Sequence, residues 1–144
     1  MNSLEMVEEN CRIASDHRVG SFAENDHKLV DEIKKIIKEK EKVPCTACRY
    51  CQPCPKGVDI PGIFNYYNMM YIDNKFSARF EFAQVMGMRK EPGFADQCIE
   101  CGLCEKHCPQ HLSIRAYLKE ADKALRPWPY KIGIDIARKI LIKS

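Results

Sequence analysis

The cysteines constrain this chain more than any other feature. Nine cysteines occur in 144 residues, and eight of them fall in two short runs. The first run is PCTACRYCQPCP at residues 44–55, and the second is QCIECGLCEKHCP at residues 97–109. Because each run crowds four thiols into one short segment, both segments are expected to form loops that gather sulfur atoms at common centres.

Disulfides are not the expected use of these thiols. The N-terminal sequence MNSLEMVEEN is acidic and polar, so it lacks the basic start and apolar core of a secretory signal. No apolar run reaches the length of a membrane helix. The expected location is therefore the cytoplasm, with no membrane span, where thiols stay reduced and disulfides are rare.

The spacing of the runs is typical of iron–sulfur ligands. The second run reads C-x2-C-x2-C-x3-C-P, the bacterial ferredoxin pattern in which the fourth cysteine ligates the other cluster. The first run is one residue shorter before its fourth cysteine. Because each fourth cysteine precedes a proline that turns the chain away, the ligands are expected to cross between runs. The predicted ligands are Cys45, Cys48, Cys51 and Cys108 for cluster I, and Cys98, Cys101, Cys104 and Cys54 for cluster II.

Other uses of the thiols remain open at this point. A single C-x2-C pair often binds zinc, and two pairs could form two tetrahedral zinc sites. A third interpretation is that the cysteines are reactive or disulfide-bonded. Two complete runs that each end in Cys-Pro favour two [4Fe-4S] clusters over both.

The rest of the chain is predicted to be helical, so the fold class is all-α. Helices are expected at residues 2–15 and 21–43, then twice within residues 55–97, where the first follows Asp59 and the second runs roughly from Lys75 to Met88. Another is expected after Cys108, and the tail has a weaker helical pattern beside a strand-like alternation. Ser3 or Asn2, a Ser21–Glu24 capping box, Asp59 and Ser113 are the expected N-terminal caps. The apolar faces expected on these helices include Leu29, Val30, Ile33, Ile36 and Ile37 on the second, and Phe76, Phe80 and Ala83 on the fourth.

The two cysteine runs belong to an internal repeat. Cys45, Cys48 and Cys51 lie 53 residues before Cys98, Cys101 and Cys104, and the offset becomes 54 from the fourth cysteine onward. Each half is thus a cysteine loop, a proline, a short turn and a capped amphipathic helix. The repeat predicts two halves packed about an approximate two-fold axis.

Three further residues could be taken for ligands. Cys11 falls on an apolar helical face and is expected to be a core thiol. His107 and His111 flank Cys108, but the cysteine count is already complete, so they are expected at the surface or behind the ligands. The chain shows no nucleophile motif, no P-loop and no glycine-rich dinucleotide fingerprint, so the sequence points to no catalytic residue of its own.

The segments PCTACRYCQPCPKGVDIPGIF and QCIECGLCEKHCPQHLSIR resemble the C-terminal iron–sulfur extension of ferredoxin-bearing aldo/keto reductases, including the short first run. They are also similar to the α-helical ferredoxin domains of fumarate reductase and dihydropyrimidine dehydrogenase. The resemblance implies an α-helical ferredoxin-like domain with a pseudo-two-fold repeat and two [4Fe-4S] clusters. It implies a helical lead-in at residues 1–43, a two-cluster domain at 44–126 and an amphipathic tail at 127–144.

The same resemblance extends to the N-terminal residues. MNSLEMVEEN resembles the last loop and helix of the aldo/keto reductase barrel, where a Glu-Asn pair approaches the adenine of NADP. Glu9 and Asn10 match that pair, while Met6 stands where the family has an arginine for the 2′-phosphate. The catalytic barrel lies upstream of everything in this chain, so NADP binding is expected only if that barrel is present.

The expected function is electron transfer by two clusters, as the C-terminal part or partner of an aldo/keto reductase-type oxidoreductase. The expected partner is a redox protein or the catalytic barrel. The alternative is a structural module in which a cluster or zinc only holds loops together. A cluster-based sensor that binds nucleic acid is a third class, but the net charge of +3 comes without a basic patch interleaved with aromatic residues, so no nucleic-acid partner is expected.

Overall fold

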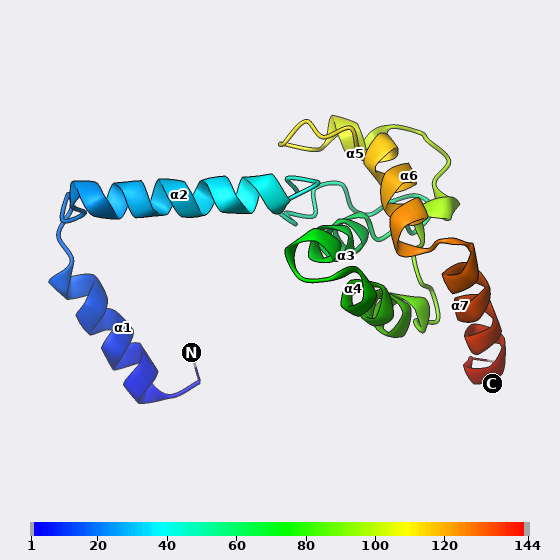
Figure 1. The fold of residues 1–144 in the computed structure, drawn as a ribbon, viewed down its shortest axis with the longest axis horizontal. Helices are drawn as coiled ribbons and strands as arrows, with labels where there is room; N and C mark the ends of the chain where they lie inside the picture. Colours follow the sequence, from blue (N-terminus) through cyan, green and yellow to red (C-terminus); the bar gives the residue numbers. More distant parts are fainter. Residues whose placement is uncertain (1, 143–144) are drawn as a thin grey trace. The chain divides into compact units, whose positions relative to one another are not determined.

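The computed structural model describes residues 2–142, and all of its regular structure is helical (Figure 1). No strand occurs among these residues, which confirms the all-α prediction. The elements are α1 (Leu4–Asp16), α2 (Glu24–Lys40), α3 (Ile60–Ile72), α4 (Lys75–Glu81), the π-helical turn η1 (Phe82–Gly87), the 3₁₀ turn η2 (Ala95–Gln97), α5 (Leu103–Lys106), α6 (Ile114–Leu125) and α7 (Trp128–Leu141). No helix in this part of the chain is both long and apolar enough to cross a bilayer.

The chain divides into two compact units, Met1–Ile37 and Lys38–Ser144. The first unit holds α1 and most of α2, and neither helix has a buried residue. The five apolar side chains of the α2 stripe are all exposed, and so is Cys11, which was expected in a core. The prediction for Cys11 was wrong because helical spacing defines an apolar face but does not supply a surface that covers it.

The caps of the first two helices differ in how well the sequence predicted them. Ser3 caps α1, accepting a hydrogen bond from the Met6 N–H. The Ser21–Glu24 box does not form, because α2 begins only at Glu24 and the Ala23 N–H donates to the Asp26 carboxylate instead. That bond is the reciprocal half of a capping box, shifted two residues along the chain.

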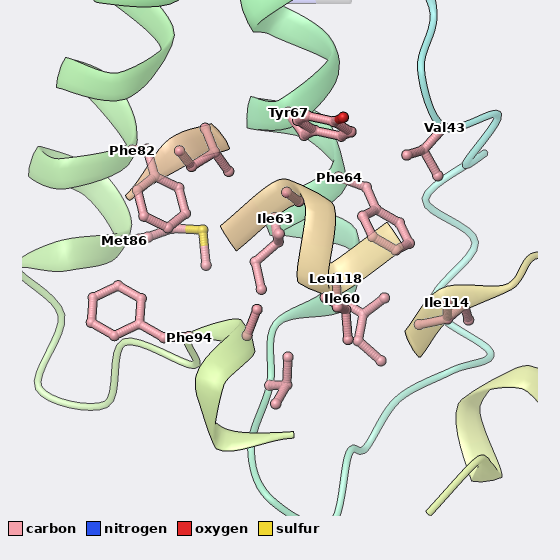
Figure 2. Packing of buried hydrophobic residues seen from close by; sticks show 14 of the residues in the cluster. Val43, Ile60, Ile63, Phe64, Tyr67, Phe82, Met86, Phe94, Ile114 and Leu118 are labelled. Carbon is pink, nitrogen blue, oxygen red and sulfur yellow. The ribbon is translucent and has the colours of Figure 1, made fainter. Parts of the chain in front are cut away.

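The hydrophobic core lies in the second unit, where α3 and α6 pack against one another. These are the equivalent helices of the two repeats, and Figure 2 shows Ile60, Ile63 and Phe64 of α3 beside Ile114 and Leu118 of α6. Asp59 caps α3 through the Gly62 N–H, as expected. Ser113 occupies the cap position of α6, but its side chain makes no capping hydrogen bond.

The buried face of α4 and η1 is not the one expected. Phe76 and Phe80 are exposed and stack on one another, with ring centroids 6.2 Å apart. Ala78, Phe82 and Met86 are buried in their place, and Figure 2 shows Phe82 and Met86 in the core. Both faces are apolar, so periodicity alone did not identify the side that α3 covers.

The tail forms a helix, α7, as favoured from the sequence. Pro127 and Pro129 flank its first residue, and proline is well tolerated at a helix start. Ile134 is its one buried residue among those described. The helix packs against η1, so the C-terminal segment belongs to the same core as the cysteine loops.

Candidate iron–sulfur centres

The two cysteine loops repeat in backbone conformation as well as in sequence. Ala47 and its equivalent Glu100 both have a positive φ, 53° and 56°. Arg49 and its equivalent Gly102 do so too, at 66° and 75°. Three of these four residues are not glycine, and holding them in the left-handed region costs free energy that neighbouring interactions must offset. Such strain in the same places of both loops indicates a shared functional requirement.

A left-handed residue of the second loop directs its N–H group at a cysteine sulfur. The Glu100 N–H donates to the Cys98 Sγ at 3.4 Å. In the first loop burial raises the pKa of Cys45, and the backbone N–H of Ala47 opposes that rise. Successive N–H groups turned inward form a concave anion site of the kind found around iron–sulfur clusters. The loops are therefore built to receive negative charge on the sulfurs.

The return from each loop to its helix is also repeated. The N–H of Gly57 donates to the Cys54 carbonyl at 2.9 Å, and the N–H of His111 donates to the Cys108 carbonyl at 3.1 Å. Gly57 and His111 again have positive φ values, of 68° and 50°. Each Cys-Pro turn thus carries the chain from the fourth cysteine directly into α3 or α6.

Two cavities combine cysteines from both runs. One has a volume of about 310 Å³ and is lined by cysteines of the second run together with cysteines from the end of the first: Cys51, Cys54, Cys98, Cys101 and Cys104. The other is lined by the first run together with the last cysteine of the second: Cys45, Cys48, Cys51 and Cys108. Cys54 and Cys108 therefore each line the cavity of the opposite run.

The chemistry of both linings fits an anionic cluster. Among the described residues that line the two cavities, the charged side chains are Arg49, Lys56 and Arg115, all cationic. Four thiolates around a cubane core leave a net negative charge, which nearby cations stabilise. The second cavity is much narrower, about 20 Å³, so its cysteine side chains must separate to admit a cluster.

Burial favours the protonated form of three of the thiols. It raises the pKa of Cys45, with further contributions from the neighbouring Cys48 and Cys108 sulfurs. It raises the pKa of Cys51 to about 11 and also raises that of Cys104. Because metal ligands must be thiolates, filling these sites releases protons.

A mononuclear site is not preformed in these loops. Within residues 2–142, no three Cys, His, Asp or Glu side chains come close enough together to hold one metal ion. Four thiolates around a single zinc ion at about 2.3 Å would bring their sulfurs within roughly 4 Å of one another. A cubane holds its four ligands farther apart than a single zinc ion does.

A residue outside the runs fixes the first loop. The Asn68 Oδ1 accepts hydrogen bonds from the N–H groups of Lys42 and Val43, at 3.0 and 2.9 Å, and its Nδ2 donates to the Val43 carbonyl at 2.8 Å. Val43 is fully buried two residues before Cys45. Sequence reasoning missed Asn68. The available signal was an asparagine inside an apolar helix, where such residues are unfavourable unless they have a specific partner.

Arg115 and Glu105 fix the second loop onto α6. The Glu105 carboxylate accepts from the backbone N–H and the Nε of Arg115, both at 2.9 Å. The Arg115 Nη1 also donates to the Glu100 carbonyl at 3.4 Å. This cation therefore braces the cysteine loop while it lines the larger cavity.

The remaining candidates lie apart from the cysteine sulfurs or at the edge of a cavity. His107 and His111 are exposed, and His107 lines the larger cavity. Glu9 and Asn10 lie exposed on α1, and both Glu9 oxygens are bonded to Arg12, which lowers the pKa of that carboxyl. The structure thus gives Glu9 a partner within its own helix.

The comparison with known families agrees with this geometry. Residues 44–112, which hold both cysteine runs and α3, match the family described as the 4Fe-4S dicluster domain. No solved structure matches the chain. The match indicates an iron–sulfur module of the electron-transfer kind that binds [4Fe-4S] clusters.

Proposed function

We propose that the chain holds two [4Fe-4S] clusters by crossed ligation and passes single electrons between them and a redox partner. Cluster I is assigned to Cys45, Cys48, Cys51 and Cys108, and cluster II to Cys98, Cys101, Cys104 and Cys54. The observation that carries the proposal is the pair of cavities, each lined by cysteines from both runs.

The residues around the cavities have distinct parts in this function. The eight thiolates hold the clusters, each of which supplies a centre that takes up and releases one electron. The N–H group of Glu100 donates to the Cys98 sulfur, and Arg49, Lys56 and Arg115 offset the negative charge. Hydrogen bonds and charge of this kind raise the reduction potential of a cluster.

Two of the eight expected ligands are exposed to solvent. Of the eight, Cys48 and Cys101 are exposed, and they occupy equivalent positions in the two loops. Electrons are therefore proposed to enter or leave through these two loop tips. The partner is proposed to be the catalytic barrel of an aldo/keto reductase-type enzyme, an assignment supported by the sequence resemblance alone.

Cysteine substitution combined with thiol mapping tests the ligand assignment. The chain is loaded with iron and sulfide under anaerobic conditions, treated with iodoacetamide and mapped by mass spectrometry. We expect about eight irons and eight sulfides per chain. Cys108→Ala should make Cys45, Cys48 and Cys51 of the first run accessible to iodoacetamide. Cys54→Ala should make Cys98, Cys101 and Cys104 of the second run accessible. Cys11→Ala is the matched control and should expose neither.

Two results contradict the proposal. Tightly bound zinc without acid-labile sulfide would replace the clusters with structural metal sites. If Cys108→Ala instead exposes Cys98, Cys101 and Cys104, the ligation does not cross.

A separate assay tests electron transfer. The loaded chain, once reduced chemically, should pass electrons to cytochrome c. It should not reduce aldehydes with NADPH, because its sequence shows no catalytic motif and no dinucleotide fingerprint. Intact clusters that pass no electron to any acceptor would favour the structural alternative.

A further inference from the structure

The turn that leads into the second cysteine run is held by side chains from the C-terminal segment. This turn, residues 94–97, ends at Cys98, whose N–H donates to the Ala95 carbonyl at 3.1 Å. The family match ends at residue 112, before both α6 and α7. The contacts between these helices and the turn show what the additional segment does.

Arg126 makes the central contact. Its side chain is only 1% exposed, and its Nη2 lies 2.9 Å from the Asp96 carboxylate. Its Nε donates to Asp122 at 2.8 Å, and the guanidinium lies over the Phe94 ring, 4.0 Å from the centroid. A buried arginine with two carboxylates and an aromatic face is fixed in one orientation, so it fixes the turn that it contacts.

The helix α7 adds a second layer of contacts. The Lys131 Nζ donates to the Asp96 carboxylate at 3.0 Å. Arg138 donates through Nη1 to the Arg89 carbonyl at 2.7 Å, and it also bonds the carbonyl of Gly87. The segment before the turn and the turn itself are thereby bound to the same helix. Figure 2 shows Phe94 beside Phe82 and Met86, so this arrangement is continuous with the core.

The first cysteine run has no such arrangement. The repeat offset of 53 places Val43 where the second run has Asp96. Val43 is held by the neutral amide of Asn68 on α3, whereas Asp96 is held by cations of the C-terminal segment. The segments that lead into the two runs are therefore held by different parts of the chain.

We propose that Arg126 is a positioning residue for the second cysteine run, so that the site of Cys98, Cys101 and Cys104 depends on the contacts of Arg126 while the site of the first run does not. This rests on the proposed function, because it assumes that both runs hold clusters. Loss of the contacts at Arg126 frees the turn at Asp96 and raises the entropy cost of gathering the three sulfurs.

The test compares single variants of the full chain after anaerobic loading with iron and sulfide. Arg126→Met removes the charge and keeps an unbranched side chain. Arg79→Met is the matched control, because Arg79 also joins α4 to the end of α6, through the Ala124 carbonyl at 2.8 Å, but does not contact the turn. Asn68→Ala is the converse variant, aimed at the first run.

The readouts are the rate of iodoacetamide modification at each cysteine and the rate of iron loss to a chelator. In Arg126→Met we expect modification of Cys98, Cys101 and Cys104 to accelerate at least about tenfold, as for other partners that orient ligands, with Cys45 and Cys48 unchanged. Arg126→Lys should recover part of the protection. Asp96→Asn removes the carboxylate charge but keeps the shape of the side chain. It should accelerate modification of Cys98, Cys101 and Cys104 as Arg126→Met does.

Three outcomes overturn the inference. The first is that Arg126→Met accelerates modification equally in both runs. The second is that neither Arg126→Met nor Asp96→Asn accelerates modification at all. The third is that Arg79→Met accelerates modification of the second run as much and as selectively as Arg126→Met does. A wild-type chain in which no cysteine is protected would reject the proposed function itself, and this result is distinct from the other three.

Discussion

Replacing Asn68 by alanine should selectively weaken the segment that enters the first cysteine run. Asn68 makes three hydrogen bonds to the backbone of Lys42 and Val43, two of them part-buried. The substitution removes all three and leaves the Val43 N–H without its partner beside a fully buried side chain, while the Val43 carbonyl still accepts from the Cys45 N–H at 2.7 Å.

The magnitude follows from the number and burial of these bonds. Each contributes about 1 kcal/mol, and a buried group left without a partner costs about 1–3 kcal/mol. The bond to the exposed Lys42 N–H contributes least, because water replaces it. We therefore expect the free energy of unfolding to fall by about 2–4 kcal/mol. For a unit of this size, that lowers the thermal midpoint by roughly 10 °C or more.

Thermal unfolding of the loaded chain, followed by circular dichroism, measures the effect. Asn65→Ala is the control on the same helix, because Asn65 is exposed and its one side-chain contact is a weak one to the Met69 sulfur at 3.7 Å. That variant should change the free energy by no more than about 0.5 kcal/mol. Equal midpoints for the two variants would refute the role given to Asn68.

Three further perturbations test other parts of the structure. Phe82→Ala should lower the free energy of unfolding by about 3–5 kcal/mol, because the Phe82 side chain is only 2% exposed. Phe80→Ala should lower it far less, because Phe80 is 51% exposed. Similar denaturation midpoints for the two variants would contradict the buried face described. Gly93→Ala should destabilise the chain by more than about 1 kcal/mol. The φ of Gly93 is +62°, and a Cβ at this position would lie 2.7 Å from the Gly57 carbonyl oxygen. An unchanged denaturation midpoint would exclude that close approach. Burial and the hydrogen bond with Tyr71 raise the pKa of Tyr67 to about 12. The stability that this protonated phenol provides should be complete below pH about 10 and be lost as the pH rises through 12. An absorbance titration in which every tyrosine ionises near pH 10 would contradict this.

Much of the candidate site follows from spacing along the chain. The two runs, their Cys-Pro turns and the offset of 53–54 residues are local features, and a local pattern of thiols defines its own chemistry. The same holds for Asp59 at the start of α3, because a cap acts on N–H groups only a few residues away. The sequence by itself therefore determined the helical class, the repeat and the cysteines that were expected as ligands.

Other features depend on which surfaces meet, and only the tertiary structure decided them. Helix 75–88 has apolar residues on two faces, and contact with α3 selects Phe82 and Met86 over Phe76 and Phe80. The residues that hold the cysteine loops, Asn68 and Arg126, lie 25 and 30 residues from the backbone or carboxylate that each one binds. No periodicity in the sequence links such pairs, because their contact exists only once the helices have packed and excluded water from the bonds between them.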